Sequence, residues 1–121
     1  YEVLALLTEH LEASCDVGRT SAELQAAFPA LDFSRLPEVW WYTPDERQAD
    51  ATPALSRQRF RNSGCREPES VFMWRVDKVA AYLARRREAS IVVIAHADLF
   101  NALLKRHFST REERFQDYWL R

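Results

Sequence analysis

The chain has 121 residues, a length that accommodates one domain covering residues 1–121 but not two ordinary domains. Its 17 basic and 18 acidic residues leave a formal net charge of -1, which gives no reason to expect a nucleic-acid partner. No apolar run approaches the roughly 20 residues of a membrane span, and the N-terminus has no secretory signal. We therefore expect a soluble, cytoplasmic protein without membrane contact.

Two residue types narrow the chemistry further. Cys15 and Cys65 show no Cys-x-x-Cys spacing, so they predict neither a disulfide framework nor a zinc knuckle. The only glycines, Gly18 and Gly64, cannot form a Gly-rich phosphate loop. We expect no cofactor and no metal ion.

In chain order, the first predicted elements are ambiguous or short. Leucines between residues 4 and 11 have helical spacing, although "VLALL" also suits a short buried strand. "TSAELQAAF" predicts a short capped helix that begins after Thr20 or Ser21 and ends before Pro29. Residues 31–41 are typical of an extended segment or turn. Residues 43–68 are polar and rich in proline, which predicts a loop or insertion.

The second half of the chain has a clearer pattern. "EPESVFMWRVDKVAAYLARRREAS" predicts a long helix that starts after Pro68, with the arginines 85–87 in its last turn. "IVVIA", residues 91–95, predicts a buried strand, and residues 98–105 return to helical spacing. A helix, a strand and a helix in succession favour an α/β fold.

His96 stands at the predicted end of this strand. In open α/β folds this position faces the crevice where ligands bind, beside the free N–H groups of the next helix. The imidazole and the amides of Ala97 and Asp98 would suit a phosphoryl group. His96 can equally be a structural histidine, with Asp98 acting only as a helix cap. His96 and Asp98 could also supply half of a metal site, but His10 and His107 lack ligand spacing.

The stretch "ESVFMWRVDKVAAYLARRREASIVVIAHADLFNALL" resembles the second half of the histidine phosphatase superfamily, the phosphoglycerate-mutase-like enzymes. The upstream stretch "LLTEHLEASCDVGRTSAELQAAFPALDFSRLPEVWW" is similar to the family region that contains a Leu-x-Glu motif and a Cys-Asp-x-Gly segment. The resemblance implies a three-layer α/β sandwich with a mainly parallel central sheet. It also implies a small phosphorylated substrate.

The resemblance also implies roles for individual residues. Glu9 of "LTEH" corresponds to the proton donor, and His96 of "AHAD" corresponds to the second histidine of the pocket. From their positions next to these two residues, His10 and the amide of Ala97 would line the substrate site. A carboxylic acid beside a bound phosphate can protonate a leaving alkoxide, while an imidazolium stabilises charge on the phosphoryl oxygens.

The sequence departs from the family at the nucleophile, a histidine in an Arg-His-Gly motif. The only Arg-His pair, Arg106-His107, is followed by Phe108 and comes after His96, so we reject it. We therefore expect the C-terminal portion of such a domain, without its N-terminal strand and nucleophile, and the first residue, Tyr1, suits a chain that lacks its start. The implied function is phosphomonoester hydrolysis or phosphoryl transfer through a phosphohistidine. The alternative is a catalytically inactive truncated or interaction module of the same fold.

Overall fold

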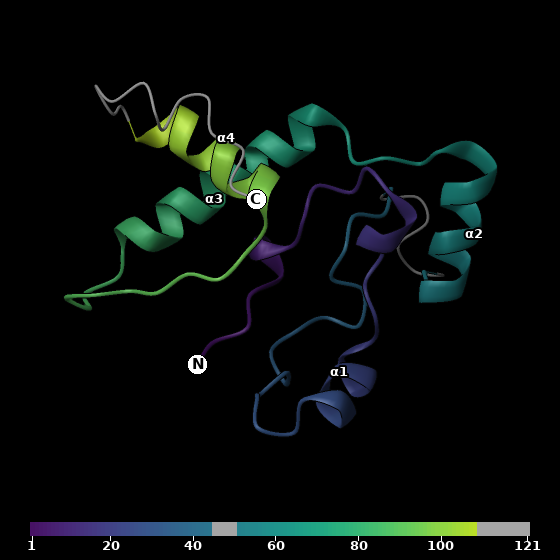
Figure 1. Cartoon of the computed structure of the whole chain (residues 1–121), viewed down its shortest axis with the longest axis horizontal. Coiled ribbons are helices and arrows are strands. Elements are labelled where there is room, and N and C mark those ends of the chain that lie inside the picture. The colour runs from purple at the N-terminus through teal and green to yellow at the C-terminus, as the bar shows by residue number, and fades with distance from the viewer. Residues whose placement is uncertain (45–50, 109–121) are drawn as a thin grey trace. The chain divides into compact units, whose positions relative to one another are not determined.

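The computed structural model describes residues 1–44 and 51–108, and every regular element within these ranges is helical (Figure 1). Its elements are the 3-10 helices η1 (Ala5–Leu7) and η2 (Ser14–Asp16) and the α-helices α1 (Ser21–Ala27), α2 (Pro53–Ser63), α3 (Glu69–Ala84) and α4 (Ala97–His107). The chain divides into two compact units. The first contains Tyr1–Ala5 and Leu11–Glu67, and the second contains Leu6–His10 and the chain from Pro68 onward.

The predicted α/β sandwich with a parallel central sheet is therefore wrong. Residues 91–95 form no strand, and Figure 1 shows the chain returning from α3 to α4 as an irregular segment. Val92 and Ile94 are 88% and 86% exposed, whereas Val93 and Ala95 are partly covered. β-branched residues favour extended backbone, but a strand also needs a neighbouring strand to bond its amides and carbonyls. No described residue supplies that strand.

In the first unit, α1 confirms the predicted capped helix. The Glu23 N–H donates to Thr20 Oγ1 at 3.2 Å, and the Thr20 N–H donates to Glu23 Oε2 at 2.8 Å. This reciprocal pair satisfies two amides that the helix itself leaves unbonded. The hydrogen bond from the Thr20 backbone is the main reason that the pKa of the Glu23 carboxyl lies below its ordinary value.

Part of the predicted polar loop, residues 43–68, is helical. The Thr52 hydroxyl caps α2 by accepting from the Leu55 N–H, Pro53 occupies the first turn, and Gly64 ends the helix at φ 60°. Proline at the start and glycine just past the end are standard helix boundaries, which the high proline content of the segment obscured. Residues 45–50 of the predicted loop lie outside the described residues.

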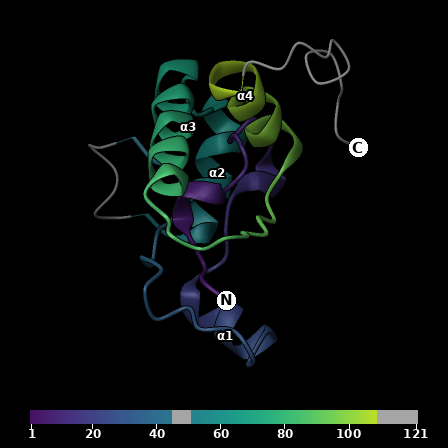
Figure 2. The same ribbon diagram turned by 90° about the vertical axis from the view of Figure 1, so that its left-hand side faces the viewer.

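In the second unit, α3 and α4 pack side by side (Figure 2). Their shared core consists of Phe72, Val76, Val79, Leu99 and Leu103. The predicted start of α3 after Pro68 is confirmed, but α3 ends at Ala84. The arginines 85–87 therefore lie past its last residue, with Arg85 as the C-cap, and not in its last turn. Among the described residues, no helix is both long and apolar enough to cross a membrane.

The segment that precedes this core has little regular structure. The leucine-rich start of the chain, for which both a helix and a strand were considered, forms neither an α-helix nor a strand. Its regular structure is the short 3-10 helix η1. Leu6 and Leu7 pack against the core of α3 and α4, so the second unit includes residues far from it in sequence. This packing brings Glu9 to the same unit as His96.

Candidate functional site

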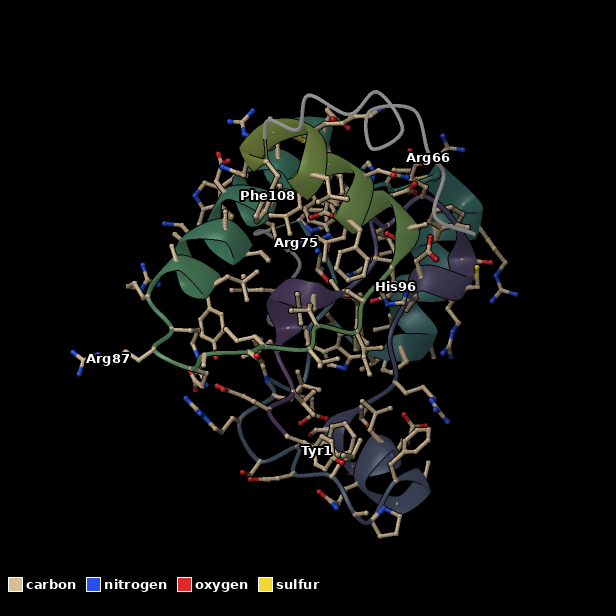
Figure 3. All side chains as sticks on the ribbon, turned by 60° about the vertical axis from the view of Figure 1, so that its left-hand side comes forward. Tyr1, Arg66, Arg75, Arg87, His96 and Phe108 are labelled. Carbon is tan, nitrogen blue, oxygen red and sulfur yellow. The ribbon has the colours of Figure 1, made fainter. Side chains whose placement is uncertain are left out.

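His96 is the residue immediately before α4, and its side chain is 54% exposed (Figure 3). It has extended backbone angles, φ -118° and ψ 162°, and its carbonyl accepts the N–H of Phe100. The expected position at the end of a strand is wrong, since residues 91–95 form no strand. The ring is exposed to solvent.

Glu9 lies close to His96 although the two residues are far apart in the sequence. Glu9 Oε2 is 3.8 Å from His96 Nδ1, and the Glu9 side chain is 20% exposed. This distance suits an ion pair when the ring is protonated, but it is too long for a hydrogen bond. The carboxyl group and the imidazole are therefore adjacent without being hydrogen-bonded to each other. The other carboxyl oxygen, Oε1, accepts the His10 backbone N–H at 2.9 Å.

The ring of His10 is largely buried rather than exposed beside Glu9. His10 is 8% exposed, and its ring stacks on Phe72 with centroids 4.2 Å apart and planes inclined by 10°. Its position in the sequence suggested a side chain that lines a substrate site. In the structure, the backbone N–H of His10 holds the Glu9 carboxylate.

The N-terminus of α4 adds backbone donors next to His96. Ala97 is the first residue of the helix and is partly exposed, and the side chain of the N-cap residue His96 makes no capping hydrogen bond. The first amides of a helix have no carbonyl partner within it and carry a partial positive charge. Asp98, the alternative cap, lies inside the first turn, and its carboxylate opposes an anion at these amides.

Arg75 on α3 is a functional candidate that the sequence analysis missed. It is 8% exposed, and its guanidinium donates to the backbone carbonyls of Leu6, Thr8 and Glu9. Hydrogen bonds from charged donors contribute about 1.5–3 kcal/mol each. The available signal was its spacing, since Arg75 falls on the apolar face of the helix with Phe72 and Val79, where a buried cation needs partners.

The arrangement joins an acid, an imidazole and the first backbone amides of a helix, which have no carbonyl partner within it. Such a set can hold an oxyanion and exchange one proton with it. Among residues 1–44 and 51–108, no three His, Cys, Asp or Glu side chains lie close enough together to hold a metal ion. Comparison of the chain with protein-family models, curated proteins and solved structures finds no match.

Proposed function

We propose that this chain carries part of a phosphoryl-transfer site for a small phosphomonoester, with Glu9 as the proton donor and His96 as a phosphoryl-contacting imidazole. The observation that carries the proposal is the 3.8 Å approach of Glu9 Oε2 to His96 Nδ1. The resemblance to the histidine phosphatase superfamily led to the same two residues. The location we propose for this activity is the cytoplasm.

In the proposed reaction, a nucleophilic histidine attacks phosphorus and the bond from phosphorus to the substrate oxygen breaks. Glu9, as a carboxylic acid, gives its proton to the leaving alkoxide. Water then attacks the phosphohistidine, and the Glu9 carboxylate takes the proton from that water. His96, when protonated, stabilises charge on the phosphoryl oxygens throughout.

The nucleophile is the component that this sequence does not supply. Its histidines are His10, His96 and His107, and none stands in an Arg-His-Gly motif. This observation favours a second candidate function, a binding module without catalytic activity. Both candidates predict that the isolated chain does not turn over substrate, but only the phosphoryl-site proposal predicts that it binds phosphate at His96.

The test is a titration with inorganic phosphate at constant ionic strength, followed through the imidazole signals of all three histidines by NMR. We expect saturable changes in the ring signals of His96. In His96→Ala, which lacks that ring, the backbone N–H signals of Ala97 and Asp98 should respond to phosphate more weakly than in the wild type. His107 is an internal control, because it is the last residue of α4, whereas His96 precedes the first. Its Nε2 lies 2.8 Å from Asp77 Oδ1. Equal changes at His96 and His107, or none at His96, would contradict the phosphoryl-site proposal.

A further inference from the structure

Arg75 fixes the backbone of the segment that carries Glu9. Its Nη1 donates to the carbonyls of Leu6 at 3.1 Å and Thr8 at 2.5 Å, and its Nη2 donates to the carbonyl of Glu9 at 3.1 Å. The planar guanidinium presents its donors in a fixed fork, so three bonds to one short segment define the path of that segment. Figure 3 shows Arg75 in the interior of the second unit.

The anchor of this guanidinium is itself rigid. Arg75 lies on α3 next to Val76, which is fully buried in the core shared with α4. The guanidinium carbon lies 5.2 Å from the centroid of the Phe72 ring, on which His10 also stacks. The side chain is therefore held at its base by the core and at its guanidinium end by an aromatic ring.

The Glu9 side chain has a second constraint beyond its backbone. The His10 N–H holds Oε1 at 2.9 Å, and Oε2 is then the oxygen that lies 3.8 Å from His96 Nδ1. A catalytic carboxyl group has to stay within about 0.5 Å of its productive position, which requires supporting groups of this kind. Arg75 bonds the carbonyl of Glu9 itself, so it acts at the residue that must be positioned.

We propose that Arg75 is a positioning residue, which holds the Glu9 carboxyl group beside His96 without touching the substrate. This inference rests on the proposed function of Glu9 and His96. It predicts that loss of the guanidinium separates the carboxyl group from the imidazole even where the helical core stays intact. It also predicts that the affinity for phosphate changes although Arg75 itself does not reach the ligand.

The first experiment measures the proximity of Glu9 to His96 without any ligand. In the wild-type background, Glu9→Gln should shift the ring signals of His96, because it removes a carboxylate 3.8 Å away. In the Arg75→Met background, the same substitution should produce less than about half of that shift, since the carboxyl group is no longer held there. Arg75→Lys, with one flexible ammonium in place of the fork, should give an intermediate response and serves if Arg75→Met does not fold.

Val76→Ala is the matched control for loss of packing. Val76 adjoins Arg75 on α3 and is fully buried, but it makes no bond to the segment of Glu9. This variant should be destabilised and yet keep the full response of His96 to Glu9→Gln. A full response in both Arg75 variants, or an equal loss in Val76→Ala, would overturn the proposal.

The second experiment separates this inference from the proposed function. Inorganic phosphate should bind the folded Arg75→Lys variant several-fold more tightly than the wild type, because release of the Glu9 carboxylate removes a negative charge from beside the anion while the cation on α3 is kept. If the wild type binds phosphate and the Arg75→Lys variant does not bind it more tightly, the positioning role fails and the proposed function stands. If the wild type does not bind phosphate, the proposed function fails, and the ring signals of His96 still decide whether Arg75 positions Glu9.

Discussion

Arg106 on α4 binds Asp77 on α3 through two nitrogens of one guanidinium. Nε donates to Oδ1 at 2.6 Å and Nη2 donates to Oδ2 at 3.0 Å, and His107 Nε2 lies 2.8 Å from the same Oδ1. A guanidinium and an imidazole at the end of α4 thus meet one carboxylate on α3. The contact joins the C-terminal end of α4 to α3, whereas His96 precedes the first residue of α4 at its other end.

This contact predicts a dependence of stability on pH. The hydrogen bond from Arg106 is the largest of the effects that hold the pKa of Asp77 below its ordinary value, and His107 adds to it. An unfolded aspartate has a pKa of about 3.9. Because the folded value is lower, the stabilisation is fully present above about pH 4 and is lost as the pH falls through the folded pKa.

The variant Asp77→Asn tests this expectation. It should lower the midpoint of thermal unfolding at pH 7, and the difference from the wild type should shrink towards zero near pH 2. Arg106→Gln should show the same pH dependence, and the double variant should add little to either single one. A difference between wild type and Asp77→Asn that persists unchanged at pH 2 would show that the charge of Asp77 is irrelevant.

The core of the helix pair predicts a larger effect. Leu99 on α4 is fully buried among Val76 and its neighbours, so Leu99→Ala removes contacts on every side and leaves a cavity. The expected loss is about 2–5 kcal/mol in the free energy of unfolding. Val92→Ala is the control, because Val92 is 88% exposed and its truncation should change the unfolding free energy by less than about 0.5 kcal/mol. Urea denaturation measures both, and similar losses would contradict the assignment of the core.

Helices were predictable from this sequence because their signals are local. The capping box of Thr20 and Glu23 and the position of Pro68 place two helix starts correctly. The absence of a strand at residues 91–95 was not predictable, because a strand is completed by hydrogen bonds to another strand and its own sequence cannot show whether that partner exists. The apolar pattern of Val92 and Ile94 therefore supported a fold that the described residues do not form.

The candidate site was predictable only in part, and for a similar reason. The resemblance identified Glu9 and His96 as candidate site residues, and in the structure Glu9 Oε2 lies 3.8 Å from His96 Nδ1. The role of Arg75 depends on the three carbonyls that the chain brings to it. Carbonyls occur at every residue, so no sequence pattern marks which of them will meet a buried guanidinium.

Gly18 in the first unit lies so close to two tryptophan rings that no larger residue fits there without a shift of the rings. A Cβ atom at Gly18 would lie 2.5 Å from Trp41 Cε3 and 2.6 Å from Trp40 Cζ2. Both indoles are held by hydrogen bonds, from Trp40 Nε1 to the Arg19 carbonyl at 2.7 Å and from Trp41 Nε1 to Ser56 Oγ at 3.0 Å. Gly18→Ala therefore forces a shift of aromatic rings that cannot move freely.

We expect Gly18→Ala to cost about 1–3 kcal/mol, as overpacking of a core does. It should also shift the indole N–H signals of Trp40 and Trp41. Gly64→Ala is the matched control, because Gly64 has φ 60° and nothing within 4 Å of an added Cβ. It should cost about 1–2 kcal/mol through backbone strain alone and leave both indole signals unchanged. Unchanged indole signals in Gly18→Ala would show that the rings do not enclose this glycine.

The last prediction concerns catalysis by the 121-residue chain itself, which we expect not to hydrolyse an aryl phosphate. Deleting a covalent nucleophile typically costs several orders of magnitude in rate, because positioning and charge stabilisation alone remain. His96 does not replace the nucleophile in this scheme, since its expected task is to stabilise phosphoryl oxygens beside the proton donor. The measurement combines a colorimetric assay of the purified chain with analysis for acid-labile phosphohistidine. Turnover that His96→Ala abolishes would make His96 the nucleophile and reverse the assigned roles. Turnover that survives both His96→Ala and Glu9→Gln would place the chemistry at a different site altogether.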